Sequence, residues 1–154
     1  MSRVQLALNV SDLEEAITFY SQLFDTAPAK VRPGYANFAI AEPPLKLVLI
    51  EGVGEPGSIN HLGVEVASTD EVQAATAVLS SKGMACDVEE STTCCYAVQD
   101  KVWVDGPDGA RWEVYTVLAD ADGDQALGGD ERCCTPEPIT LGAPATSGTA
   151  SGCC

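Results

Sequence analysis

The feature that most constrains the fold of this chain is an internal repeat. An alternating apolar and polar stretch at 5–10 (QLALNV) is matched by a second one at 61–66 (HLGVEV). Each stretch runs into a Ser that is followed three residues later by Glu, at Ser11 and again at Ser68. Period-two alternation is typical of a half-buried strand, and Ser-x-x-Glu is the capping box that opens helices. The sequence therefore predicts the same strand–helix unit twice.

Further apolar runs, separated by turn residues, follow each predicted helix. These predicted strands lie at 35–41 and 45–50 in the first half and at 94–98, 102–104 and 111–118 in the second. The segment 105–109 (DGPDG) predicts a hairpin turn. We expect an α+β fold of two βαβββ modules, about 1–51 and 60–119, that share a cavity between them.

Composition changes after Ala119. The remaining segment, 120–154, holds six acids against one Arg, lacks aromatic residues and is rich in Pro, Gly, Ser and Thr. Such a composition does not build a packed core. We expect a mostly disordered, acidic, cysteine-containing tail, which leaves 1–119 as the working domain.

The charge balance limits the possible partners. The chain has 23 acidic and 8 basic residues, a net charge of −15, whereas nucleic acids and anionic membranes attract Lys/Arg patches. No apolar run approaches the roughly 20 residues of a membrane span, and no signal-peptide core follows the first residues. We therefore expect a cytoplasmic protein that binds small molecules, with no nucleic-acid or membrane partner. The sequence leaves the oligomeric state open.

Three polar residues stand at positions that could hold a metal. Gln5 and His61 each begin a predicted strand on the face opposite its apolar row, and the residue two further on is small, Ala7 or Gly63. Glu113 lies in an otherwise apolar strand, where a carboxylate needs a charged partner or a metal. An amide oxygen, an imidazole nitrogen and a carboxylate can form a three-ligand face for a divalent ion with open positions for substrate.

Other interpretations of these residues stay open at this point. A lone His that begins a strand is more often an ordinary surface or core residue than a ligand, and Gln5 could be a simple polar strand residue. Glu113 could pair with Arg111 or Lys101 instead of a metal.

Cysteine is unusually frequent and unusually arranged. Six of the seven cysteines form adjacent pairs: Cys94-Cys95, Cys133-Cys134 and Cys153-Cys154. Two neighbouring thiolates can chelate a thiophilic centre. Two thiolates match a trivalent arsenical with one carbon substituent, which has two exchangeable hydroxyls. Inorganic arsenite has three, and zinc takes four ligands. Alternatively, Cys94 and Cys95 are small apolar residues, although consecutive strand residues point to opposite faces. Cys86 is expected to be ordinary packing.

Several segments together resemble the vicinal oxygen chelate superfamily of glyoxalases, bleomycin-resistance proteins and extradiol dioxygenases. The more specific resemblance is to the ArsI-type carbon–arsenic lyases and the related cadmium-induced proteins. It rests on VQLALNV at 4–10, YANFAI at 35–40, NHLGVE at 60–65, TTCCY at 92–96 and RWEVY at 111–115.

This resemblance implies a non-haem Fe(II) enzyme that uses dioxygen to cleave the carbon–arsenic bond of trivalent methyl or aromatic arsenicals, releasing arsenite. By position, Gln5, His61 and Glu113 hold the iron, and Cys94 and Cys95 hold the arsenic. The superfamily more usually has His where this chain has Gln5.

Two other functions are weighed against this one. A thiol-based arsenic- or cadmium-binding resistance protein without turnover would account for the extra cysteine pairs. A glyoxalase-like isomerase is disfavoured, because the segment equivalent to that of Glu113, 45–50, offers no metal ligand.

Overall fold

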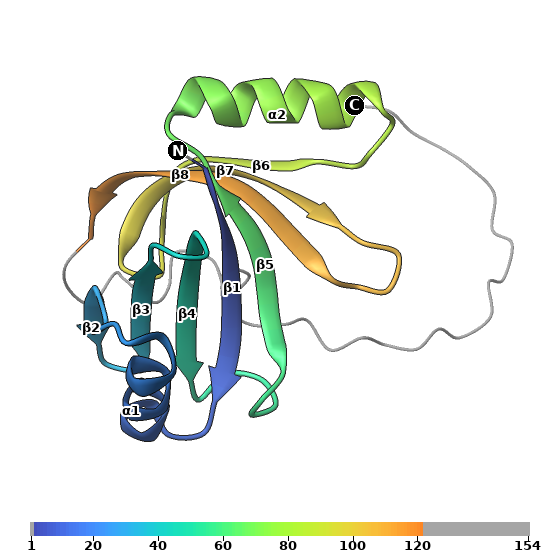
Figure 1. Ribbon diagram of the computed structural model, residues 1–154. Helices are drawn as coiled ribbons and strands as arrows, with labels where there is room; N and C mark the ends of the chain where they lie inside the picture. The colour runs from blue at the N-terminus through green and yellow to red at the C-terminus, as the bar shows by residue number, and fades with distance from the viewer. Residues whose placement is uncertain (1, 122–154) are drawn as a thin grey trace, which may run out of the picture.

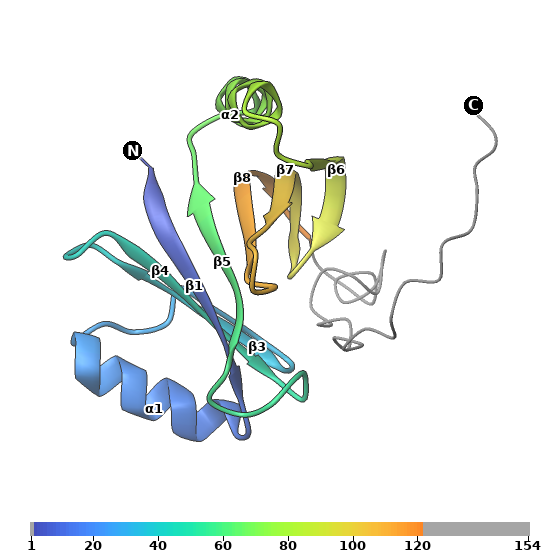
Figure 2. The same cartoon turned by 90° about the vertical axis from the view of Figure 1, so that its right-hand side faces the viewer.

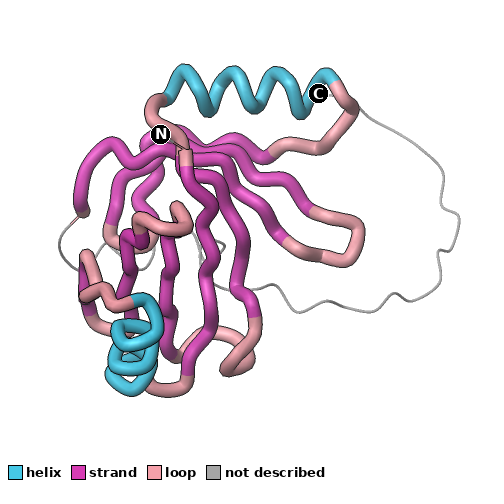
Figure 3. Tube along the Cα trace, viewed as in Figure 1, coloured by secondary structure: helices cyan, strands magenta, loops and turns pink. Residues whose placement is uncertain are grey.

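A computed structural model of the chain describes residues 2–121 (Figure 1). The elements in chain order are β1 (Arg3–Val10), α1 (Leu13–Phe24), β2 (Lys30–Arg32), β3 (Tyr35–Ile40), β4 (Leu45–Glu51), β5 (Ile59–Glu65), α2 (Thr69–Ser81), β6 (Asp87–Cys94), β7 (Ala97–Asp105) and β8 (Arg111–Asp120). The order strand, helix, three strands occurs twice, and Figure 3 shows both copies. The predicted fold class of two βαβββ modules is confirmed. Neither described helix is long and apolar enough to cross a membrane.

The strands of both modules form one continuous sheet. Its order is β2-β3-β4-β1-β5-β8-β7-β6, so the modules join where β1 and β5 pair antiparallel. Within each module the first and last strands pair in parallel, β1 with β4 and β5 with β8. The sheet curls, with α1 outside the first half and α2 outside the second (Figure 2). The inner face of the curl is therefore left for a cavity.

The pairing of β1 with β5 places the two modules about an approximate two-fold axis. Leu6 lies opposite Leu62, while Gln5 lies opposite Gly63 and Ala7 opposite His61. Each polar residue thus faces the small residue of the other strand. A Cβ on Gly63 would come within 3.0 Å of Glu113 Cγ, so the glycine makes room for that side chain.

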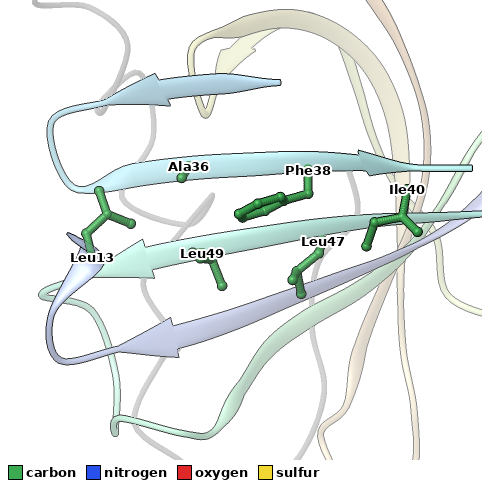
Figure 4. Close-up of a cluster of buried hydrophobic side chains, with 6 residues drawn as sticks. All are labelled: Leu13, Ala36, Phe38, Ile40, Leu47 and Leu49. Atoms are coloured by element: carbon green, nitrogen blue, oxygen red, sulfur yellow. The ribbon is translucent and has the colours of Figure 1, made fainter. Parts of the chain in front are cut away.

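The main apolar core lies on the outer side of the first half. It contains Leu13, Ala36, Phe38, Ile40, Leu47 and Leu49, seen in Figure 4. The apolar row of β1, which includes Leu6 and Leu8, packs against this core beside α1. The opposite row, Gln5, Ala7 and Asn9, is buried more deeply. A polar row buried inside the curl is what places functional groups there.

Two strand predictions need correction. The short edge strand β2 was not predicted, because it holds a single apolar residue, Val31, which is 46% exposed. The predicted strand at 94–98 is wrong: β6 ends at Cys94 and β7 begins at Ala97, so this segment contains a turn. The edge strand β6 escaped detection because it is polar and mostly exposed, with no clear apolar alternation.

The helix ends follow local signals, with one exception. The predicted cap Ser68 begins α2, and Gly83 ends it with a φ of +79° and the paired hydrogen bonds of a Schellman motif. The predicted cap Ser11 is wrong. Asp12 caps α1 by accepting a hydrogen bond from the Glu15 amide at 2.8 Å. Asp12 has the same spacing to a Glu, and starting one residue later buries Leu13 at the first helical position.

The predicted start of the tail falls within a strand. β8 continues to Asp120, whose carboxylate pairs with Lys30 of β2. The rest of the predicted tail, including both of its cysteine pairs, lies outside the described residues.

Candidate metal and thiol site

The three predicted metal ligands come together on the inner face of the sheet. Gln5, His61 and Glu113 are each at most 5% exposed. The Gln5 side-chain nitrogen lies 3.0 Å from His61 Nε2 and 2.7 Å from Glu113 Oε1, and the last two atoms are 3.4 Å apart. Gln5 and His61 are each the third residue of their strand, not the first as predicted, and their equivalence is kept.

These separations fit one face of a metal's coordination shell. Donors about 2.1 Å from an octahedral cation lie about 3 Å from one another. The Gln5 amide faces His61 and Glu113 with its nitrogen, so a cation requires this amide to be turned over, and amide orientations follow the hydrogen-bond network. Among the described residues no three His, Cys, Asp or Glu side chains form a metal cluster, so the site depends on this amide oxygen.

Tyr115 supports the turned amide. Its hydroxyl contacts both Gln5 Oε1 and, at 2.9 Å, Glu65 Oε2, but one hydroxyl hydrogen serves one of them well. After turning, the Gln5 amide donates to this hydroxyl and the hydroxyl donates to Glu65. Burial, followed by the Glu65 and Glu113 charges, raises the pKa of Tyr115 far above its ordinary value, so the hydroxyl keeps its hydrogen.

A chain of side-chain hydrogen bonds sets the tautomer of His61. Its Nδ1 lies 2.7 Å from Asn60 Oδ1, which only accepts, so Nδ1 carries the hydrogen. Asn60 donates to Asn9 at 2.9 Å, and Asn9 donates to Ser58 at 2.9 Å. The bare Nε2 lone pair of His61 is thereby presented to Gln5 and Glu113, as a metal ligand requires. Sequence reasoning missed this chain, although Asn9 continues the inward row of Gln5.

Lys101, one of the two ion-pair partners considered for Glu113 from the sequence, lines the cavity. It is 1% exposed, and its ammonium lies 3.0 Å from Glu113 Oε2. Burial by itself raises the pKa of the Glu113 carboxyl, but the charge of Lys101 and the interactions with His61 outweigh it and lower the pKa to about 2. Glu113 therefore contacts both groups at once: Oε2 pairs with Lys101, and Oε1 faces Gln5 and His61. The other candidate partner, Arg111, bonds Asp105 at 3.3 Å.

A second ion-pair group lies beside the first. Glu65 lies 3.2 Å from both Lys46 and Arg3. Burial alone raises the pKa of the Glu65 carboxyl, but Lys46, the Tyr115 hydroxyl and Arg3 together lower it. Burial lowers the pKa of Lys46, partly offset by Glu65. The inner face of the sheet thus carries ion pairs formed by residues of both modules.

The cysteine pair occupies the turn between β6 and β7. Cys95 and Tyr96 are the central residues and have φ values of 52° and 62°, the left-handed pair of a type I′ hairpin turn. Because Cys95 belongs to a turn, the expectation of opposite faces for strand neighbours does not apply. The sulfur atoms of Cys94 and Cys95 lie 3.4 Å apart, close enough for one atom to bridge them.

Tyr96 holds this turn against the first module. Left-handed backbone costs about 1–2 kcal/mol for each non-glycine residue. The Tyr96 ring is buried and lies 5.5 Å from that of Tyr35, and its hydroxyl donates to the Pro33 carbonyl at 2.9 Å. The packing of Tyr96 offsets the strained turn and fixes where the cysteines lie.

One cavity connects the cysteine pair to the metal candidates. Its lining consists of Gln5, Tyr35, Lys46, Val48, His61, Cys94, Cys95, Gln99, Lys101 and Glu113. Its free volume is about 10 Å³, close to what a single water molecule needs. Cys86 does not line this cavity and contacts Ser80 and Met84 instead.

Fold and site together define a two-module βαβββ protein with a buried cluster of Gln, His and Glu side chains on its concave face. A family model described as the Glyoxalase/Bleomycin resistance protein/Dioxygenase superfamily matches residues 3–114, and the chain belongs to that superfamily. An extradiol ring-cleaving dioxygenase from B. fuscum shares the fold, with a TM-score of 0.56 and 16% identity. That match covers 78% of this chain and 34% of the dioxygenase chain.

Two curated relatives are much more similar. The cadmium-induced protein CadI of Mycobacterium tuberculosis is 66% identical over 122 residues, covering 79% of this chain and 80% of CadI. The trivalent organoarsenical cleaving enzyme of Thermomonospora curvata is 64% identical over 137 residues, covering 88% of this chain and 90% of that enzyme. The resemblance to carbon–arsenic lyases and cadmium-induced proteins is confirmed.

Proposed function

We propose that this protein cleaves the carbon–arsenic bond of trivalent organoarsenicals, with Fe(II) and dioxygen, and releases arsenite. The observation that carries the proposal is that the sulfur pair and the three-residue cluster line the same enclosed cavity. The name of the 64% identical relative, a trivalent organoarsenical cleaving enzyme, supports the same reaction.

In their reduced state, Cys94 and Cys95 would bind the arsenic. A trivalent arsenical R–As(OH)₂ exchanges its two hydroxyls for the two sulfur atoms and releases two water molecules, which consume the thiol hydrogens. The sulfur atoms lie 3.4 Å apart, which supports chelation of one arsenic atom by both of them. Holding the arsenic in this way turns an encounter between two molecules into an effectively unimolecular step.

Gln5, His61 and Glu113 would hold the iron. When bound, the iron supplies the activation of dioxygen for oxidation of the organic group. The surrounding residues prepare the ligands: Asn60 fixes the His61 tautomer, and Lys101 keeps Glu113 ionised. Closure of the charged cavity over the substrate would also exclude bulk water from the reacting group.

Substrate entry requires movement of the turn that carries the cysteines. A free volume of about 10 Å³ is too small for an organoarsenical. The hairpin at 94–97 connects two strands at the edge of the sheet and closes over the cavity through Tyr96. We propose that it opens for binding and closes again for cleavage.

The test is arsenite release from a trivalent methyl or phenyl arsenical, with and without Fe(II) and air. The double variant Cys94→Ser/Cys95→Ser should lose arsenical binding and keep iron binding, and His61→Ala should do the reverse. Cys86→Ser is the matched thiol control and should behave like the parent protein. Arsenite release by His61→Ala at the parent rate would show that the mechanism is wrong.

A second candidate function is capture of arsenic or cadmium without turnover. The paired sulfur atoms suit it, and the 66% identical relative is named a cadmium-induced protein. Anaerobic incubation separates the two functions, because cleavage needs dioxygen whereas capture proceeds equally without it.

A glyoxalase-like isomerase is less well supported. The residue equivalent to Glu113 is Val48, since Ala7 pairs with Val48 as Gly63 pairs with Glu113. Val48 offers no donor for a fourth protein ligand. A cytoplasmic location and the lack of nucleic-acid or membrane partners stay predictions.

A further inference from the structure

Gln99 carries a buried oxygen that nothing described so far uses. This residue of β7 is 5% exposed and lines the cavity of the cysteine pair. Its side-chain nitrogen donates to the Cys94 carbonyl at 3.4 Å, while Oε1 has no hydrogen-bond partner among the described residues. Glu89 Oε2 is the other such side-chain atom in residues 2–121, and Glu89 does not line the cavity.

The orientation of the Gln99 amide is fixed by its neighbour. Turning the amide over would bring Oε1 against the Cys94 carbonyl oxygen, and two acceptors repel each other. The unused group is therefore an acceptor and not a donor. Buried acceptors without partners are rare, because they give up their hydrogen bonds to water without replacement. The cavity is thus built for a ligand that brings a hydrogen-bond donor to this position.

Arsenic chemistry distinguishes which ligand has this donor. A trivalent organoarsenical gives up both hydroxyls to two thiols and keeps none. Inorganic arsenite has three, so As(OH)₃ and two Cys–SH groups give (Cys–S)₂As–OH and two water molecules. No redox change occurs, and one arsenic-bound hydroxyl remains as a donor beside the sulfur atoms.

We propose that Gln99 Oε1 accepts a hydrogen bond from the hydroxyl of arsenite bound to Cys94 and Cys95. The inference rests on the proposed function and deepens it, because arsenite is the inorganic product of the proposed cleavage. Gln99 thereby lets the protein distinguish arsenite from an organoarsenical held by the same two sulfur atoms.

The test compares two ligands on metal-free protein by titration calorimetry. Arsenite and a trivalent methyl arsenical are titrated into the parent protein and into Gln99→Met, which has similar size and no amide. A phosphine keeps the cysteines reduced, since a dithiol would compete for arsenic. Gln99→Met should weaken arsenite binding by about 5- to 150-fold relative to methyl arsenical binding, the usual effect of an unmet buried hydrogen bond.

Gln99→Glu separates the two roles of the Gln99 side chain: acceptor of a hydrogen bond from the ligand, and donor to the Cys94 carbonyl in the turn. It keeps an acceptor oxygen and loses the bond to the Cys94 carbonyl, so it should restore much of the preference for arsenite. Equal weakening of both ligands by Gln99→Met, or no change in either, would overturn the inference. Failure of the parent protein to bind the methyl arsenical would instead contradict the proposed function.

Discussion

The two modules have the same topology and divide the work unequally. At equivalent positions, Gln5 of the first module corresponds to His61 of the second, and Val48 corresponds to Glu113. The outer apolar core is built by the first module, although α1 and α2 each bury a single residue, Leu13 and Val72. The comparison teaches that a doubled fold can build its outer apolar core in one copy and place the buried Glu113 carboxylate in the other.

Lys101 and Tyr35 show the same division. In the strand register, Lys101 lies opposite Tyr115, two residues after Glu113. Tyr35 lies opposite Ile50, two residues after Val48, so Lys101 and Tyr35 occupy equivalent positions. The second module has an ammonium where the first has a phenol ring, because only the second has a carboxylate to neutralise.

The largest effect that would sharpen this comparison is expected at Lys101. Lys101→Met leaves the Glu113 carboxylate buried without its cation and should cost about 3–5 kcal/mol in the free energy of unfolding. Tyr35→Phe in the first module loses the hydrogen bond from Asn37 and should cost about 0.5–1.5 kcal/mol. Denaturant unfolding of metal-free protein measures both. Equal losses would contradict the assigned division of roles.

The next effect concerns metal affinity. Asn60→Leu removes the acceptor that sets the His61 tautomer and should weaken Fe(II) binding about 10–100-fold. Its counterpart in the first module is Val4, which is 48% exposed, and Val4→Ala should leave Fe(II) affinity unchanged. Anaerobic titration with Fe(II) gives both values. An unchanged affinity in Asn60→Leu would show that the tautomer is set elsewhere.

A smaller effect should be alike in the two modules. Asp12→Ala and Ser68→Ala each remove a helix cap and should each cost about 1 kcal/mol in the free energy of unfolding. Ser11→Ala is the control, because Ser11 is exposed and does not cap α1, and it should stay within about 0.5 kcal/mol of the parent. A larger loss at Ser11 than at Asp12 would reverse the assigned helix start.

The smallest effect is expected in the pH dependence of stability. Hydrogen bonds from the Thr69 hydroxyl and the Ser91 amide lower the pKa of the Asp100 carboxyl. The unfolded chain therefore takes up this proton first on acidification, and the stabilisation is lost as pH falls from about 4 through the lowered pKa. Asp100→Asn should flatten this part of the curve of unfolding free energy against pH. Denaturant unfolding at a series of pH values between neutral and acidic measures the curve. Parallel curves would assign the acid sensitivity to other carboxylates.

Much of the fold could be predicted because its signals are local. Alternation marked β1 and β5, apolar runs marked β3, β4 and β8, and the cap Ser68 marked the start of α2. The prediction failed where the local signal was weak or doubled. β2 and β6 are polar edge strands, and Ser11 and Asp12 both have a Glu at the capping distance.

The sequence by itself determined the repeat and picked out the five candidate site residues. Only the tertiary structure decided how they combine: that Lys101 shares Glu113 with Gln5 and His61, and that a strained turn brings both sulfur atoms to one side. The physical reason is that these contacts depend on the register between strands and on left-handed turn geometry. The alternation within a single strand predicts neither the register nor the turn geometry, because pairing and packing elsewhere in the chain set them.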